Sequence, residues 1–200
     1  EGNQCNAIIS KQQVGNVEAN TLISGCTMTE IPDNVTSIGE GAFMGARFNG
    51  MFIPSNVTSI GDNAFKGCSS LRVVSFEPGS KLESIGNYAF GDCSNLTGSI
   101  TIPASVTSIG ARAFVNCTSL TSITIPPSVT SIGRYVFSGC DKLSSVTFGQ
   151  GGTWYYGTQA QQEAKEGGTA YTIVAGTNYA DVFKNSGGSG PGNEDYWYTK

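Results

Sequence analysis

The pair Ile-Gly recurs along the chain at nearly constant spacing, and this repeat constrains the fold more than any other feature. Successive copies are 22, 25, 24 and 23 residues apart, at Ile38, Ile60, Ile85, Ile109 and Ile132. A phenylalanine follows each isoleucine by five residues, and a cysteine follows four of these phenylalanines by three. Such a period is typical of a solenoid, in which each unit buries its apolar residues only against its neighbours.

The unequal steps place insertions between the apolar positions rather than within them. Relative to a step of 23, one extra residue falls between Leu96 and Ile100, and two fall in the segment 77–81. One residue is lost between Ala46 and Ile53. These places are turns or strand entries, so the apolar frame of each unit survives, as stacking requires.

One unit predicts the path of a whole coil. Leu120, Ile123 and Ile125 predict a short strand with one buried face, and Val129 with Ile132 predicts an inward-facing return segment. The segment "RYVF" is interpreted as a single helical turn that points its phenylalanine inward. Stacking such coils would bring parallel strands about 4.8 Å apart. We predict an α/β repeat fold: a right-handed solenoid with short parallel strands on its main face, short return strands and single helical turns opposite, and a spine of phenylalanines.

The repeat resembles the BspA-like class of bacterial leucine-rich repeats, whose units have the form "CxxLxxIxIPxxVxxIGxxAFxxC". The likeness covers about residues 28–148 and recurs five times. It implies a bacterial protein that is secreted or exposed on the cell surface and that adheres to host matrix proteins or to other bacteria. The chain begins at Glu1 with no initiator methionine or signal peptide, and it is interpreted as a trimmed or mature form.

Three segments are expected. Residues 1–30 form an atypical N-terminal capping unit, because "NVEANTLISGC" is a degraded copy of "TSIGDNAFKGC". Residues 31–148 hold five repeats. Residues 149–200 break the frame and are rich in aromatic residues, so they predict a small α+β cap over the other open end of the stack.

Composition narrows the classes of function. Only 13% of residues are charged, the net charge is −4, and no basic run appears, which disfavours nucleic acid as a partner. Histidine is absent, which removes the usual general base and the commonest metal ligand. No apolar stretch approaches the ~18 residues of a membrane span. No nucleophile–base pair is visible, so we expect no enzymatic activity. We also expect no metal, no cofactor and no transmembrane segment, and we expect a monomer.

The six cysteines raise the question of disulfides. Cys68, Cys93, Cys117 and Cys140 share one repeat position, so their side chains would point the same way. We expect these four to be buried free thiols that pack as small apolar groups. Cys5 and Cys26 lie in the N-terminal cap, where a bridge between them stays an open alternative.

Side chains expected to face outward from the main strands form the candidate binding surface. Toward the C-terminal end the surface is nearly uncharged and rich in hydroxyls, whereas Phe52, Arg72 and Val73 interrupt it near the N-terminal end. An outward Phe beside an outward Val is typical of an interaction surface, unless the N-terminal cap covers them. The candidate residues for a protein partner are Phe52, Arg72, Val73, Ser75, Thr101, Ser122, Thr124 and Thr147.

Three hypotheses of function remain. The first is a non-enzymatic module that binds an extracellular protein through this face. The second is a glycan or cell-wall binding module in which aromatic residues of the cap, Trp154, Tyr156 and Trp197, stack on sugars. The third is a structural spacer within a larger surface protein. For the aromatic residues, packing inside the cap is the alternative to sugar stacking.

Overall fold

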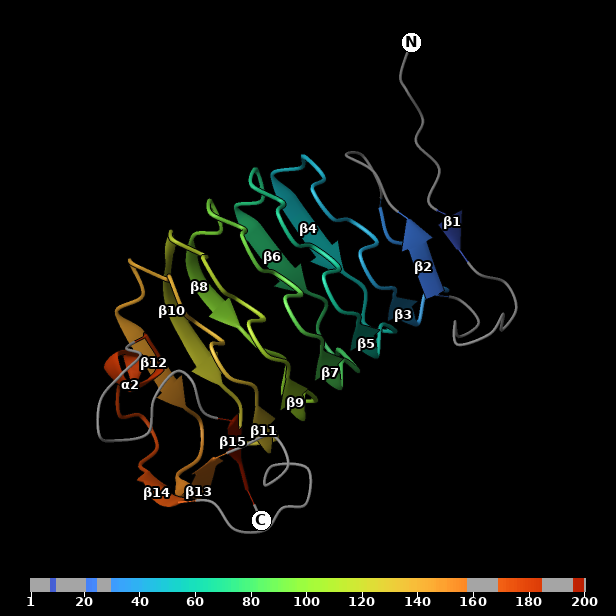
Figure 1. Ribbon diagram of the computed structural model, residues 1–200. Coiled ribbons are helices and arrows are strands. Elements are labelled where there is room, and N and C mark those ends of the chain that lie inside the picture. The colour runs from blue at the N-terminus through green and yellow to red at the C-terminus, as the bar shows by residue number, and fades with distance from the viewer. Residues whose placement is uncertain (1–7, 10–20, 25–29, 158–168, 185–195, 200) are drawn as a thin grey trace.

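Each Ile-Gly repeat forms one coil of a solenoid, and the coils stack along a single axis (Figure 1). The computed structural model describes residues 8–9, 21–24, 30–157, 169–184 and 196–199. Each coil has a main strand, a return strand and a turn segment, which lie on three sides of a common apolar core. The predicted solenoid of short parallel strands is therefore confirmed.

The main strands carry alternating inward and outward side chains. In β10 (Leu120–Ile125), Leu120, Ile123 and Ile125 are buried while Thr121 and Thr124 are exposed. This alternation follows from the two-residue period of a strand, so the sequence pattern alone determines which face is buried. The other main strands are β4 (Gly50–Ile53), β6 (Val73–Phe76), β8 (Gly98–Thr101) and β12 (Ser145–Phe148).

The return strands are two residues long and pair in parallel from coil to coil. Each has the sequence Ser-Ile, and each isoleucine is buried. They are β3 (Ser37–Ile38), β5 (Ser59–Ile60), β7 (Ser84–Ile85), β9 (Ser108–Ile109) and β11 (Ser131–Ile132). Together they form the centre of a ten-stranded sheet that continues into both ends of the molecule.

The third side consists of the turn segments that carry the phenylalanine spine. Neighbouring rings are stacked, with centroids 5.0 Å apart for Phe65 and Phe90 and 5.3 Å apart for Phe90 and Phe114. The first ring of the spine, Phe43, also meets Phe48 edge-on at 5.6 Å. The spacing of the stacked rings matches the distance between coils, so one ring per coil gives a continuous stack.

The turn segments are pairs of short turns rather than a continuous turn of helix. Residues two before and two after each phenylalanine have φ between 53° and 72°. A left-handed residue cannot continue a right-handed helix, which is why the expected single helical turn takes this form. Alternate amides instead bond to the next coil, as from Phe65 N to Ala89 O at 2.7 Å.

Both ends of the ten-stranded sheet receive additional strands. At the N-terminal end, β2 (Thr21–Ser24) pairs in parallel with β3, and β1 (Ile8–Ile9) pairs with β2. At the other end, β15 (Tyr196–Tyr198) pairs with β11, followed by β13 (Gly152–Gly157) and β14 (Thr169–Ile173).

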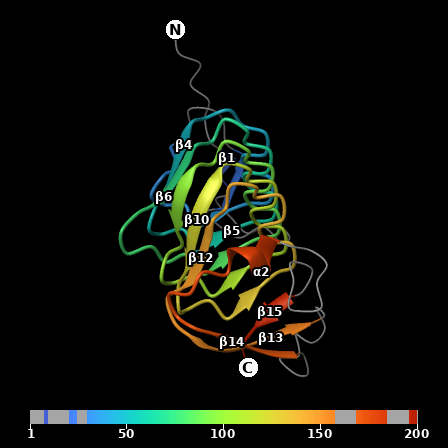
Figure 2. The same ribbon diagram turned by 90° about the vertical axis from the view of Figure 1, so that its left-hand side faces the viewer.

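The C-terminal cap covers the last coil, as Figure 2 shows for α2 (Ala180–Lys184). Phe183 of α2 meets Phe137 edge-on at a centroid distance of 6.1 Å and so ends the spine. Asn178 accepts a bond from the Val146 amide and donates one to the Ser144 carbonyl, which closes the exposed edge of β12. Within the described residues, no helix is long and apolar enough to cross a membrane.

Candidate binding surfaces

The predicted protein-binding face has its most apolar part on β4 and β6. Phe52 is 53% exposed and Val73 is 56% exposed. Because Gly50 pairs with Val73 and Phe52 pairs with Ser75, the two apolar side chains are diagonal neighbours on one face. Of the four large apolar side chains that are exposed in the described part of the chain, two therefore lie together here.

No described segment of the N-terminal unit covers this apolar pair. β1 and β2 extend the return sheet and not the main sheet. A pocket of about 510 Å³ instead opens beside Phe52, and its lining includes Ile31, Met51 and Pro54. The alternative in which the cap folds over Phe52 and Val73 is not seen in the residues that the structure describes.

The main face is divided between β6 and β8. β4 and β6 form one two-stranded sheet, and β8, β10 and β12 form another. The coil that contains β8 has one extra residue, Gly98. Gly98 has a φ of 77° and lies where the pairing of β8 with β10 shifts in register. A groove of about 470 Å³ lies at the division and brings together Ser75 and Thr101, two of the predicted residues.

Ser122, Thr124 and Thr147 lie in the hydroxyl-rich part of the face, on β10 and β12. Ser122 pairs with Ser145, and Thr124 pairs with Thr147, on neighbouring strands. The hydroxyl oxygens of Thr124 and Thr147 lie 3.3 Å apart. Arg72 is exposed at the entry to β6, where its carbonyl accepts a bond from the Thr97 amide. The structure thus places all eight predicted residues on one side of the solenoid, in two parts that meet at the groove, where Ser75 and Thr101 lie.

The two indoles that the glycan hypothesis assigns to sugar stacking are buried, so the alternative, packing inside the cap, holds for them. Trp154 is 4% exposed and Trp197 is 1% exposed. Trp197 packs on Phe183 at a centroid distance of 5.0 Å, and Trp154 meets Phe148 at 5.3 Å. Sugar stacking needs an open ring face, whereas these rings fill the end of the core. The side chain of Tyr156 lies outside the described residues.

The four repeated cysteines are buried free thiols, as predicted. Each thiol also donates a hydrogen bond to the carbonyl of the phenylalanine in the preceding coil, at 3.0 to 3.2 Å. Burial raises the pKa of Cys68 to about 11 and raises that of Cys93 further. At neutral pH the thiols of Cys68 and Cys93 are therefore protonated and are poor nucleophiles. Cys5 and Cys26 lie outside the described residues.

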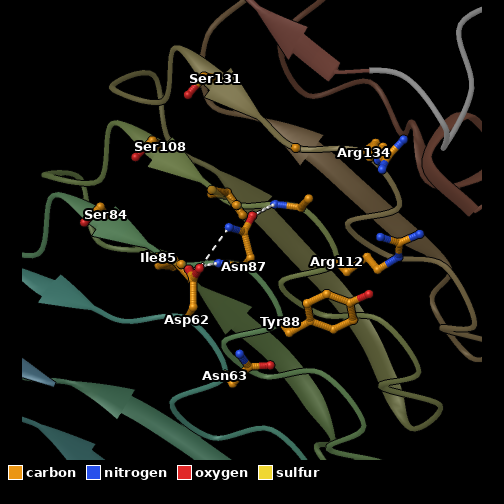
Figure 3. Close-up of a pocket in the computed structure, with 15 residues that line it drawn as sticks. Asp62, Asn63, Ser84, Ile85, Asn87, Tyr88, Ser108, Arg112, Ser131 and Arg134 are labelled. Carbon is orange, nitrogen blue, oxygen red and sulfur yellow. Dashed lines mark hydrogen bonds between the residues drawn. The ribbon is translucent and has the colours of Figure 1, made fainter. Parts of the chain in front are cut away.

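A second surface, which the sequence reasoning missed, lies where the return strands meet the turn segments. Its pocket has a volume of about 620 Å³. Figure 3 shows its hydroxyls on one side, its cationic and aromatic groups on the other, and Asn87 between them. The labelled residues are Asp62, Asn63, Ser84, Ile85, Asn87, Tyr88, Ser108, Arg112, Ser131 and Arg134.

Cations and tyrosine rings alternate in a row that lines this pocket at Tyr88, Arg112 and Arg134. The Lys66 ammonium lies 4.6 Å from the centroid of the Tyr88 ring, and the Arg112 guanidinium lies 5.5 Å from it. Arg112 also lies 4.5 Å from the Tyr135 ring, and Arg134 lies 5.7 Å from that ring. These distances permit cation–π attraction. We call Lys66, Tyr88, Arg112, Arg134 and Tyr135 the cationic ridge.

The backbone of the cationic ridge is held in an unfavourable conformation. Tyr88, Arg112 and Tyr135 have φ of 53°, 56° and 57°. Gly and Asn occupy the same position in the first two coils, as Gly41 and Asn63. A left-handed conformation costs an ordinary residue about 1–2 kcal/mol, whereas Gly and Asn tolerate it. Tyr88, Arg112 and Tyr135 are half-buried, and the repeat of apolar residues gives no sign of the surface that they form.

Comparison with known proteins places the repeat in a family. The sequence profile described as "BspA type Leucine rich repeat region" matches residues 21–144 and 83–160, in six copies. No curated protein sequence matches the chain.

Solved structures of bacterial leucine-rich repeat proteins are similar. One, from T. pallidum, is 32% identical with a TM-score of 0.53, over 64% of this chain and 57% of that protein. Another, from Bacteroides ovatus, is 32% identical with a TM-score of 0.56, over 71% of this chain and 39% of that protein. A third, a leucine rich cell surface protein from Faecalibacterium prausnitzii, is 27% identical with a TM-score of 0.55, over 74% of this chain and 39% of that protein. This chain thus spans between two-fifths and three-fifths of their lengths. By the extent of the profile match, the chain belongs to the BspA-type leucine-rich repeat family.

Proposed function

We propose that this chain is a non-enzymatic module that binds an extracellular protein through the outer face of its main strands. The observation that carries the proposal is the exposed pair Phe52 and Val73, side by side on β4 and β6. Secretion or display on a bacterial surface is part of the proposal. Its support is the family and the similar protein from F. prausnitzii, which is described as a cell surface protein.

The proposed mechanism is docking on a rigid surface. The main strands are fixed by coil-to-coil pairing, so the face needs little ordering when a partner binds. Phe52 would enter a pocket of the partner as an apolar anchor, and the surrounding hydroxyls would supply directional hydrogen bonds. Burial of one such side chain contributes about 2 kcal/mol, or about 30-fold in affinity.

Binding to a panel of purified extracellular matrix proteins tests this proposal. The double variant Phe52→Thr, Val73→Ser carries the residue types that other coils have at these positions. It should weaken binding to the recognised matrix protein by at least about 30-fold. The matched control is Val174→Ser, because Val174 is equally exposed but lies beyond the last coil. Equal binding by all three proteins, or no binding by any, would contradict the proposal; the second result is what the spacer hypothesis expects.

The division of the chain is also proposed. Residues 1–30 and 149–200 would close the two ends of the five repeats in 31–148. The strands and the helix that extend the stack at either end support this division. Separate expression of residues 31–148 should then give an aggregating protein, because the apolar ends of the stack would be exposed.

A further inference from the structure

We propose that the pocket beside the cationic ridge is a binding site for an acidic polysaccharide. The pocket lies where the return strands meet the turn segments, and none of its lining residues belongs to the proposed protein-binding face. The inference is therefore independent of the proposed protein-binding function, and the two can fail separately.

The charge of the site favours an anion. Lys66, Arg112 and Arg134 bring three cations to one ridge of a protein whose net charge is −4. Arginine pairs in bidentate fashion with carboxylate and sulfate groups, and the tyrosine rings between the cations hold them in line. The pocket's carboxylate, Asp62, accepts hydrogen bonds from the backbone and side-chain amides of Asn87. The pocket itself is lined by two arginines, Arg112 and Arg134, and by this one carboxylate.

The backbone of the ridge gives an independent reason to infer a function. Ten residues flank the five phenylalanines at the left-handed positions, and seven of them are Gly, Asn or Asp. The three exceptions are Tyr88, Arg112 and Tyr135, all of which belong to the cationic ridge. Strained residues cluster at functional sites because the side chain is needed in a place where the backbone disfavours it.

The rest of the pocket favours a sugar chain over a peptide. Its floor is formed by β7, β9 and β11, whose neighbouring strands are paired on both sides. An extended peptide that bound by strand addition would have no free edge here. Ser84, Ser108 and Ser131 place hydroxyls opposite the guanidinium groups, one in each successive coil. Hydroxyls beside cations suit a polymer that carries both hydroxyl and acidic groups in each unit.

Binding of heparin and polygalacturonate, with dextran and polyglutamate as comparisons, tests the proposal. We expect the two acidic polysaccharides to bind, with an affinity that falls as the salt concentration rises. Dextran should not bind, and polyglutamate should bind at least 10-fold more weakly than the polysaccharides. Polyglutamate binding as tightly would assign the site to acidic peptides and overturn the proposal, as would the absence of polysaccharide binding.

The variant Arg112→Asn separates ligand binding from stability. Asn adopts the same conformation at Asn63 and Asn116, so the variant should fold and its melting temperature should be unchanged or raised. Its affinity for heparin or polygalacturonate should fall about 10-fold. The matched control is Arg72→Asn, which removes the same charge from the main face. Unchanged affinity for Arg112→Asn, or an equal loss for Arg72→Asn, would show that no specific site exists at the ridge.

Discussion

The thiol of Cys117 donates a hydrogen bond to the carbonyl of Phe90 in the preceding coil, with 3.2 Å between Sγ and O. The cysteine position therefore links neighbouring coils besides filling space in the core. We expect Cys117→Ala to lower the free energy of unfolding by about 1–2 kcal/mol, through loss of this bond and a small cavity. Urea denaturation measures the change. A loss below about 0.3 kcal/mol would mean that the thiol bond contributes nothing to stability.

The buried thiols also predict a weakness at alkaline pH. Burial raises the pKa of Cys68 to about 11 in the folded state, above the ordinary value. Because the pKa of the thiol is higher in the folded state, the Cys68 thiol of the unfolded chain loses its proton first as the pH rises. The contribution of this thiol to stability is thus complete below about pH 8.5 and is lost as the pH approaches 11.

Urea denaturation between pH 7.5 and 10.5 tests this dependence. The free energy of unfolding should decline over that range, and the decline should be shallower in Cys68→Ala. The other ionisable groups are the same in both proteins, so the comparison of the two proteins removes their contribution. Identical slopes for the wild type and the variant would refute the assignment to Cys68.

The glycine of the Ile-Gly pair lies so close to the backbone of the preceding coil that a larger side chain would not fit between the coils. A Cβ atom on Gly110 would lie 2.6 Å from the amide nitrogen of Asn87 in the preceding coil. Backbone atoms cannot move aside as a flexible side chain can, so we expect Gly110→Ala to destabilise the protein by about 3 kcal/mol. Thermal denaturation measures the loss. The control is Gly152→Ala, where a Cβ would meet no atom within 4 Å.

Much of the fold could be predicted from sequence because the information is repeated in each coil. The spacing of Phe90, Phe114 and Phe137 predicts the stacked spine, and the alternation in 120–125 predicts which face of β10 is buried. The glycine of the Ile-Gly pair, by contrast, has a role that the spacing of the repeat does not reveal. Its real constraint, the close approach of two backbones, depends on the distance between coils and so could be found only in the structure.

The functional surfaces were less predictable because they depend on departures from the repeat. Outward residues such as Phe52 and Val73 could be placed, since a strand's two-residue period determines its faces. Trp154 and Trp197 could not, because the cap has no repeat to indicate which rings face inward. The cationic ridge could not be predicted because a helical turn was expected in this part of the coil. Arg112, two residues before Phe114, instead has a left-handed backbone, and this conformation determines the direction of its side chain.

Photo-crosslinking from position 52 tests the central claim, that the outer face of the main strands contacts the protein partner. A photoreactive phenylalanine at position 52 should crosslink to the matrix protein that the chain binds, because Phe52 is 53% exposed and is the proposed apolar anchor of the contact. The same probe at position 174, an equally exposed position beyond the last coil, should give no product. Crosslinking from position 174 alone, with binding intact, would contradict the account.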